Sequence, residues 1–312
     1  MLSGSLILLL RPLMTLICVS TAPLFVPLEE VSGEWVRSVI PPRRAGSRKG
    51  ENGVVVVIGG SGTYHGAPFL TAMAAMRSGV DLAYLYAPER IVAPLRALSP
   101  SLIVMPYTDL KLTRRVAAHI LSSLPRANSA AVGPGLALAK EEALLELLSG
   151  LLERGLGLVV DASALQPQIL GRVRGGRVVL TPHAGEFQRV FGIHPGEGLE
   201  ERVANAQRAA LDHQVTILLK GPIDVITDGQ QVFINRTGNC AMTVGGTGDV
   251  LTGLVAGIMA KGVAPAEAAA AAAYINGVCG DAAMRELGLH ILPTDIIEMI
   301  PRVMKNFDRI VS

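Results

Sequence analysis

The chain has few cysteines, few aromatic residues and almost no net charge, and each scarcity excludes a class of protein. Its three cysteines, Cys18, Cys240 and Cys279, lie far apart and form no CxxC pair. This spacing argues against a zinc site and is typical of a reducing compartment, so we expect a cytoplasmic protein. Aromatic residues make up only 4% of the chain, which argues against a base-stacking platform. The net charge of +2 gives no electrostatic footprint for nucleic acid.

The chain also lacks a clean apolar segment long enough to cross a membrane. Residues 1–28 are largely apolar, but Arg11, Pro12 and Pro23 interrupt them, whereas a spanning helix needs roughly 20 consecutive apolar residues. No basic residue precedes the apolar region, as a signal peptide would require. We expect residues 1–28 to be an extension outside the fold, with a membrane anchor or a misassigned start site as alternatives. Residues 29–312 are long enough to form one domain with a large core.

Short apolar runs and amphipathic stretches alternate along this domain. The run Val54–Ile58 is unbroken and β-branched, which predicts a buried strand, and an alanine-rich helix follows it to Ser78. The further predicted strands are 80–87, 102–105, 129–132, 157–161, 178–180 and 216–220, and the further predicted helices are 29–40, 89–98, 111–124, 140–153, 199–213, 250–260 and 266–287, with a last helix from Pro293. This alternation predicts an α/β fold with a mostly parallel central sheet and helices on both faces. Asp228-Gly229 predicts a hairpin between 225–227 and 231–234.

Polar and glycine-rich segments stand at the ends of several predicted strands. GGSGTYHGAP follows the strand 54–58, Gly133-Pro134-Gly135 follows 129–132, Asp161 ends 157–161, and TPHAGE follows 178–180. Ligands of doubly wound sheets bind beyond the carboxyl ends of the strands, so these segments should converge on one rim. The first of them is neither a P-loop, since it lacks GK[ST], nor a dinucleotide fingerprint, since its third glycine is missing.

The stretch Asn235–Gly253, NRTGNCAMTVGGTGDVLTG, combines three glycines, an acidic residue and the start of an apolar run that is predicted to be helical. The free N–H groups and the positive end of a helix dipole at such a position suit a phosphate. A carboxylate repels the anion that the helix end attracts. Asp249 is therefore interpreted either as a base beside a phosphate-binding turn or as the N-cap of the helix.

These motifs together resemble the ADP/ATP-dependent NAD(P)H-hydrate dehydratases, a carbohydrate-kinase-like family of the ribokinase-like superfamily. The resemblance covers about residues 29–308 and is carried by VIGGSGTYHGAP, AVGPGL, VVDASAL, LTPHAGEF, LLKGPIDVIT and NRTGNCAMTVGGTGDVLTG. GTGD alone would indicate only the wider superfamily, whereas several motifs in order are specific to the family.

The resemblance implies a ribokinase-like fold and a nucleotide-dependent dehydration of (6S)-NADHX or (6S)-NADPHX to NADH or NADPH. A nucleotide would phosphorylate the hydroxyl of the nicotinamide ring, and phosphate would then leave. The resemblance also implies Mg²⁺, ADP or ATP as the co-substrate, with ADP favoured, and a homotetramer. An epimerase would act as a separate protein, because residues 1–28 are too few to hold such a domain.

The resemblance further assigns roles to individual residues. Asp249 would be the catalytic base and would also contact the substrate. The other implied site residues are Gly245, Gly246, Thr247 and Gly248 in the anion hole, Lys220, Gly221, Pro222, Ile223 and Asp224 around AMP, and Ala67, Gly135 and His183 against the hydrate. We expect no dedicated protein ligands for magnesium, which binds readily to phosphate oxygens and water.

The chain departs from the family pattern at four places. Ser163 stands where an acidic residue is expected, Arg48 replaces a histidine, Cys240-Ala241 replaces Pro-Gly, and Ala137 replaces a glycine. The main alternative function is a small-molecule kinase of the same superfamily, such as a thiazole or hydroxymethylpyrimidine kinase, although TPHAGEF and KGPIDVIT favour the dehydratase.

Two more distant functions are a non-catalytic nucleotide-binding protein and a dinucleotide-dependent oxidoreductase. The intact Asp249 argues against the first, because a protein that only binds a nucleotide has no need of a base there. The missing third glycine after the strand 54–58 argues against the second.

Overall fold

The computed structural model describes residues 27–312 of the chain. The expectation for residues 1–28 therefore concerns residues that lie outside the described part, apart from the last two. Within residues 27–312, no helix combines the length and the apolar character that crossing a bilayer requires.

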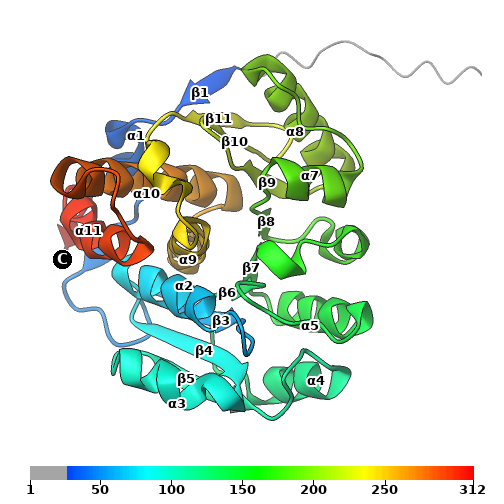
Figure 1. Cartoon of the computed structure of the whole chain (residues 1–312). Helices are drawn as coiled ribbons and strands as arrows, with labels where there is room; N and C mark the ends of the chain where they lie inside the picture. Colours follow the sequence, from blue (N-terminus) through cyan, green and yellow to red (C-terminus); the bar gives the residue numbers. More distant parts are fainter. Residues whose placement is uncertain (1–26) are drawn as a thin grey trace, which may run out of the picture.

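A ten-stranded sheet forms the centre of the molecule, in the order β1-β11-β10-β9-β8-β7-β6-β3-β4-β5 (Figure 1). Its strands are β1 (Leu28–Glu30), β3 (Val54–Ile58), β4 (Leu82–Pro88), β5 (Ile103–Tyr107), β6 (Ser129–Val132), β7 (Gly157–Val160), β8 (Val178–Leu180), β9 (Thr216–Leu219), β10 (Asp224–Thr227) and β11 (Val232–Asn235). Among these described strands, only β10 runs antiparallel to its neighbours, β9 and β11. The predicted mostly parallel sheet and the predicted hairpin are both confirmed.

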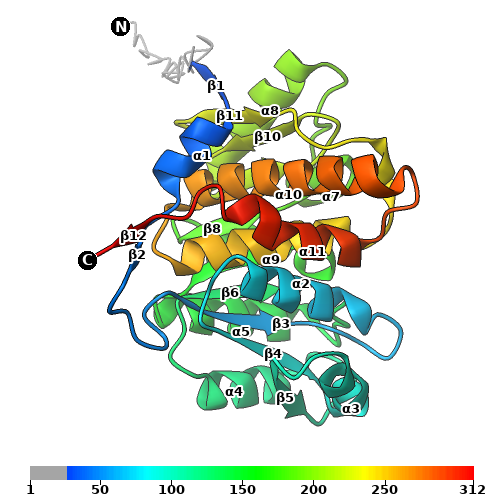
Figure 2. The ribbon, with the colours of Figure 1, turned by 90° about the vertical axis from the view of Figure 1, so that its left-hand side faces the viewer.

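Helices cover both faces of the sheet, because the strands bury side chains on both sides. Val55 and Val57 of β3 point into one core, and Val56 and Ile58 point into the other. The helices of the first face are α1 (Gly33–Val39), α2 (Gly66–Arg77), α3 (Glu89–Leu98), α9 (Thr247–Ala260), α10 (Pro265–Leu287) and α11 (Pro293–Met304) (Figure 2). Those of the second face are α4 (Arg114–Ser123), α5 (Glu141–Glu153), α6 (Leu170–Val173), α7 (Ala184–Phe191) and α8 (Leu199–His213).

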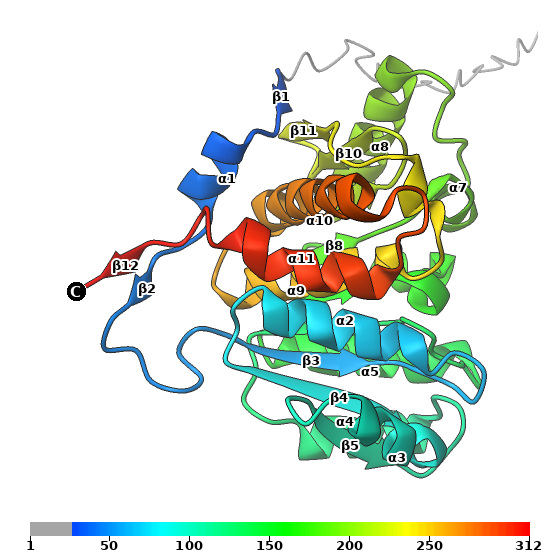
Figure 3. The ribbon, with the colours of Figure 1, turned by 60° about the vertical axis from the view of Figure 1, so that its left-hand side comes forward.

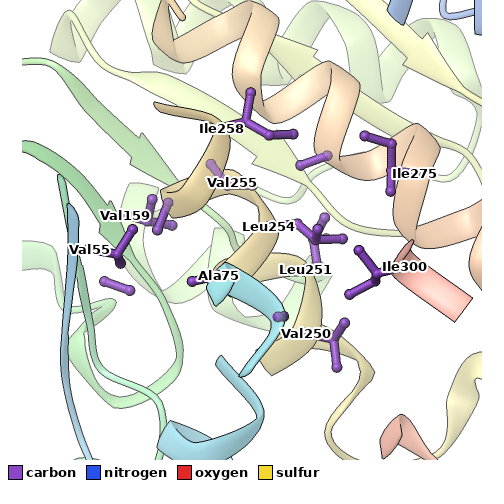
Figure 4. Packing of buried hydrophobic residues seen from close by; sticks show 14 of the residues in the cluster. Val55, Ala75, Val159, Val250, Leu251, Leu254, Val255, Ile258, Ile275 and Ile300 are labelled. Carbon is purple, nitrogen blue, oxygen red and sulfur yellow. The ribbon is translucent and has the colours of Figure 1, made fainter. Parts of the chain in front are cut away.

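Helix α9 is the most deeply buried helix of the first face, and it carries the GTGD motif at its N-terminus. Every residue from Val250 to Ala260 is buried, as expected of a helix that is apolar all round (Figure 4). A Cβ atom at Gly253 would lie 2.1 Å from the carbonyl oxygen of Thr71, so glycine lets α2 approach closely. The buried hydroxyl of Ser129 on β6 donates to the carbonyl of Ala256. These contacts fix the position of the helix against the sheet.

The prediction of one helix over residues 29–40 is wrong at its start. Leu28–Glu30 forms β1, which pairs in parallel with β11, and α1 begins only at Gly33. The side chain of Ser32 caps this helix by accepting a hydrogen bond from the N–H of Trp35. Three further features were not predicted. They are α6, α7 and a small parallel sheet of β2 (Arg43–Arg44) and β12 (Ile310–Val311), which projects from the body of the molecule (Figure 3).

Candidate active site

Two of the predicted loops pack tightly against each other at the carboxyl ends of β3 and β6. The N–H of Gly60 donates to the carbonyl of Pro134, and a Cβ atom at Gly133 would lie 1.9 Å from the carbonyl oxygen of Asp161. A Cβ atom at Gly135 would lie 3.3 Å from the Cβ of Ala67 and 2.5 Å from the carbonyl oxygen of Tyr64. The predicted convergence of loops on one rim is therefore confirmed, and Ala67 and Gly135 are neighbours there.

The N-terminus of α9 begins at a glycine that no other residue could replace without strain. Gly246 is the N-cap with φ +106°, and a Cβ atom there would lie 2.7 Å from Pro293 and 2.8 Å from Leu70. The N–H groups of the first turn, from Thr247 onward, lack partners in the preceding turn. Asp249 is the third helical residue, so the interpretation of Asp249 as the N-cap is wrong. Its carboxylate remains available for other chemistry.

A compact group of charges lies beside this helix end. Lys220, which follows β9, places its Nζ 3.1 Å from Oδ1 of Asp161 and 3.9 Å from Oε2 of Glu186. The other oxygen of Asp161, Oδ2, accepts a hydrogen bond of 2.7 Å from the hydroxyl of Thr252 on α9. A Cβ atom at Gly248 would lie 3.5 Å from Nζ of Lys220, so the ammonium stands against the first turn of α9. Ion pairs and one hydrogen bond therefore connect the ends of β7 and β9 with the N-terminal part of α9.

The environment moves the pKa of Asp249 toward neutrality. Burial makes the largest contribution and raises this pKa, and the negative charge of Asp161 raises it further. The positive charge of Lys220 lowers it, and the net pKa is about 7. Burial lowers the pKa of Lys220, but the charges of Asp161 and Glu186 outweigh it, and the net pKa is raised. The site therefore holds a fixed cation beside a carboxyl group that titrates near neutral pH, which suits a general base.

His183 caps α7 and is held in one orientation. Its Nδ1 accepts hydrogen bonds from the N–H groups of Gly185 and Glu186, and Oε2 of Glu186 accepts one from the N–H of His183. Because Nδ1 is an acceptor, the ring proton lies on Nε2, which is a donor. The imidazole is 61% exposed, so it can reach a ligand on the rim.

A cavity of about 630 Å³ opens next to the charge cluster. Of the predicted AMP and anion-hole residues, those that line it are Lys220, Gly221, Pro222, Asp224, Thr247 and Gly248. Ile223, Gly245 and Gly246 are not among its lining residues. The N–H of Gly221 donates a hydrogen bond to Oδ1 of Asp224, and Oδ2 of Asp224 accepts one from the side-chain amide of Asn235.

Part of the cavity wall was not predicted from the sequence. The segment 237–243 and helix α10 both contribute to it, and the N–H of Gly238 and the amide of Asn239 are held by the carboxylate of Asp281. Asn276 of α10 is 6% exposed and lines the cavity, yet its Oδ1 has no hydrogen-bond partner within residues 27–312. The amide that closely follows the alanine run of α10 was the available signal, since a buried polar group requires a partner.

The residues present fit Mg²⁺ that arrives with a nucleotide. In the part of the chain that the structure describes, no group of three or more His, Cys, Asp or Glu side chains could hold a metal ion. Both oxygens of Asp161 have protein partners, whereas no side-chain hydrogen bond in residues 27–312 engages the carboxylate of Asp249. Magnesium bound mainly by phosphates and water needs few protein ligands, so it can enter this site together with a nucleotide.

Sequence comparison assigns the chain to a known family. A family model described as NAD(P)H-hydrate dehydratase matches residues 55–302. The chain belongs to the NAD(P)H-hydrate dehydratase family. A relative from Cenarchaeum symbiosum, an ADP-dependent (S)-NAD(P)H-hydrate dehydratase, is 50% identical over 276 residues, which cover 88% of this chain and 96% of the relative.

Two other matches place the chain within the NAD(P)H-hydrate dehydratase family. A bifunctional NAD(P)H-hydrate repair enzyme from Pyrobaculum aerophilum is 47% identical over 85% of this chain but only 53% of its own length. The ADP/ATP-dependent NAD(P)H-hydrate dehydratase from Bacillus subtilis, co-crystallised with ATP/Mg²⁺, has a TM-score of 0.79 at 30% identity, covering 91% of this chain. A hydroxyethylthiazole kinase from Pyrococcus horikoshii, at 18% identity and a TM-score of 0.58, shares the fold alone. The ribokinase-like prediction is confirmed by a ribokinase-like superfamily protein from Enterococcus faecalis, which has a TM-score of 0.78 at 29% identity and covers 90% of this chain and 96% of its own.

Proposed function

We propose that this chain dehydrates (6S)-NADHX and (6S)-NADPHX to NADH and NADPH with ADP as the phosphoryl donor. The observation that carries the proposal is the position of Asp249, whose pKa of about 7 suits a base, in the first turn of α9 beside Lys220. The names of the 50% and 49% identical relatives, both ADP-dependent dehydratases, support ADP rather than ATP.

The proposed reaction proceeds in two steps. Asp249 takes the proton of the ring hydroxyl while the hydroxyl oxygen attacks the terminal phosphorus of ADP. The bond between that phosphorus and the oxygen that bridges the two phosphates of ADP breaks, and AMP is released. The ring phosphate then leaves with its carbon–oxygen bond electrons, a neighbouring carbon loses a proton, and a double bond forms. Phosphate is a far better leaving group than hydroxide, so the first step makes the second possible.

The protein's contribution to this chemistry is positioning and charge stabilisation. The N–H groups at Thr247 and Gly248 would hold the transferred phosphoryl group, and the ammonium of Lys220 would balance its charge. AMP would lie along Lys220–Asp224, and Ala67, Gly135 and His183 would contact the hydrate. Mg²⁺, held mainly by the phosphates and water, would neutralise phosphate charge.

Three further parts of the proposal concern the setting of the enzyme. The chain would act in the cytoplasm and as a homotetramer. It would work with a separate epimerase, and the bifunctional names of several relatives support such a pairing.

The deciding experiment supplies hydrated NADH, Mg²⁺ and either ADP or ATP, and follows the absorbance of the reduced nicotinamide ring. We expect the absorbance to rise with ADP, with one phosphate and one AMP released for each NADH formed. Folded protein that gives no rise with either nucleotide would favour the kinase function, in which the phosphorylated product accumulates.

A further inference from the structure

Asp161 occupies a central place in the site, although the proposed reaction gives it no role. It follows β7, is 3% exposed, and both of its oxygens are engaged. Oδ1 accepts from Lys220 at 3.1 Å, and Oδ2 accepts from Thr252 at 2.7 Å. A buried carboxylate with one cationic and one hydroxyl partner is fixed in both position and rotation.

We infer that Asp161 is a positioning residue, which holds the Lys220 ammonium against the first turn of α9 and sets the charge that faces Asp249. This inference rests on the proposed function. It makes Thr252 the residue that orients Asp161, because its hydroxyl binds the oxygen that Lys220 leaves free.

The geometry of α9 explains why these residues act together. Thr252 follows Asp249 by three positions, so both lie on the same face of the helix. One face of α9 therefore presents the base and the group that anchors Asp161. Nζ of Lys220 lies beside Gly248 of α9, so residues that follow β7 and β9 meet this helix at two places, Thr252 and Gly248.

The charged groups around Asp249 come from three elements. Asp161 at the end of β7 and Lys220 at the end of β9 act on Asp249 directly, and Glu186 of α7 acts on Lys220. Removing the charge of Asp161 takes away a negative neighbour of Asp249. Without this repulsion the ionised form of Asp249 is favoured, so the pKa of Asp249 should fall.

The first test is carbon-13 NMR titration of the Asp249 carboxyl group in free protein, which needs no turnover. We expect a midpoint near neutral pH in the parent chain and a midpoint about one unit lower in Asp161→Asn. The control Ser129→Ala removes another buried hydroxyl that anchors α9, to Ala256, and should lower stability without moving the midpoint. An unchanged midpoint in folded Asp161→Asn would overturn the inference even if the enzyme is active.

The second test is the kinetics of dehydration. We expect Asp161→Asn to lower kcat by about 10²-fold, because the Lys220 ammonium would no longer be fixed where it stabilises the transition state. We expect Thr252→Val to lower kcat by about tenfold, because Asp161 would lose the hydroxyl that orients it. Thr252→Ser keeps the hydroxyl and should restore most of the rate. Equal rates in Thr252→Val and Thr252→Ser would reduce Thr252 to a packing residue and overturn its assigned role. If the parent chain itself shows no dehydration, the proposed function fails, while the titration still decides the placement of Asp161.

Discussion

A partly buried lysine lies at each end of α9, and the pKa values of the two lysines are shifted in opposite directions. Lys220, beside the N-terminus, has carboxylates within 4 Å, and its pKa is raised. Lys261, at the C-cap, donates to the carbonyl of Ser78, and burial lowers its pKa to about 8. No carboxylate lies within 4 Å of Lys261 among residues 27–312. Burial without a nearby carboxylate lowers the pKa of a lysine, whereas neighbouring carboxylates keep Lys220 protonated at the place where phosphate is proposed to bind.

The lysine at the C-terminal end of α9 is also surrounded differently in chemical terms. It stands where two helix C-termini present carbonyl groups, at Ser78 of α2 and at its own position on α9. A cation there serves the helix ends. The N-terminal end instead exposes N–H groups and the free carboxylate of Asp249. From this contrast we expect residues at the N-terminal end of α9 to affect catalysis and Lys261 at the C-terminal end to affect only stability. Four predictions test this expectation.

The largest expected effect is that of Asp249→Asn. The amide cannot accept the hydroxyl proton, so turnover should fall by about a thousandfold or more, while ADP binding measured by calorimetry should remain. Turnover close to that of the parent chain would remove Asp249 as the base.

The next prediction exchanges the two lysines for methionine. Lys220→Met leaves the buried charge of Asp161 without a cationic partner, so kcat/KM should fall by about 10²-fold and the free energy of unfolding by about 3 kcal/mol. The matched control Lys261→Met should leave turnover unchanged and reduce the free energy of unfolding by about 1 kcal/mol. Equal losses of activity in the two variants would break the contrast between the ends.

The pH dependence of kcat/KM should report the titration of Asp249. Its pKa is raised to about 7, so the active, ionised form accumulates as the pH rises. We expect activity to increase through about pH 7 and then to level off. An enzyme already fully active at pH 5 would show that no group of this kind limits the rate.

The smallest effect concerns stability and has a defined sign. Because the folded-state pKa of Asp249 lies above its ordinary value, the folded protein retains that proton between about pH 4 and 7, and stability falls as the pH rises through this window. Asp249→Asn removes the titrating group. Urea unfolding should show the variant to be more stable than the parent chain by about 1–3 kcal/mol at pH 8, and much less so at pH 4. A difference independent of pH would contradict this.

The sequence predicted the sheet well because its inner strands are buried on both faces. Val54–Ile58 is an unbroken apolar run, and 129–132 is apolar apart from Ser129. Both form parallel strands that are covered on both faces, and both are found at the predicted bounds. The edge strand β1 escaped prediction because three exposed residues, Leu28–Glu30, gain their structure only by pairing with β11, some 200 residues away. Pairing of that kind leaves no local pattern.

The parts of the candidate site that lie in short sequence motifs could be predicted, whereas contacts that depend on how distant elements pack could not. GTGD and the loop after β9 could be read directly, and the structure places Lys220 against Gly248. The contacts of Asp161 with Lys220 and Thr252 join residues that lie 59 and 91 positions apart. Their distances depend on how β7, β9 and α9 pack, which no spacing in the sequence reveals.

The most direct test of the account follows the oxygen of the ring hydroxyl. Hydrated NADH that carries a heavy oxygen isotope at this hydroxyl is converted with ADP and Mg²⁺, and the label is located by mass spectrometry. If the hydroxyl is phosphorylated before it leaves, the label will appear in the released inorganic phosphate. Label found only in water would show that the hydroxyl departs without phosphorylation, and it would contradict the assignment of Asp249 as the base for phosphoryl transfer.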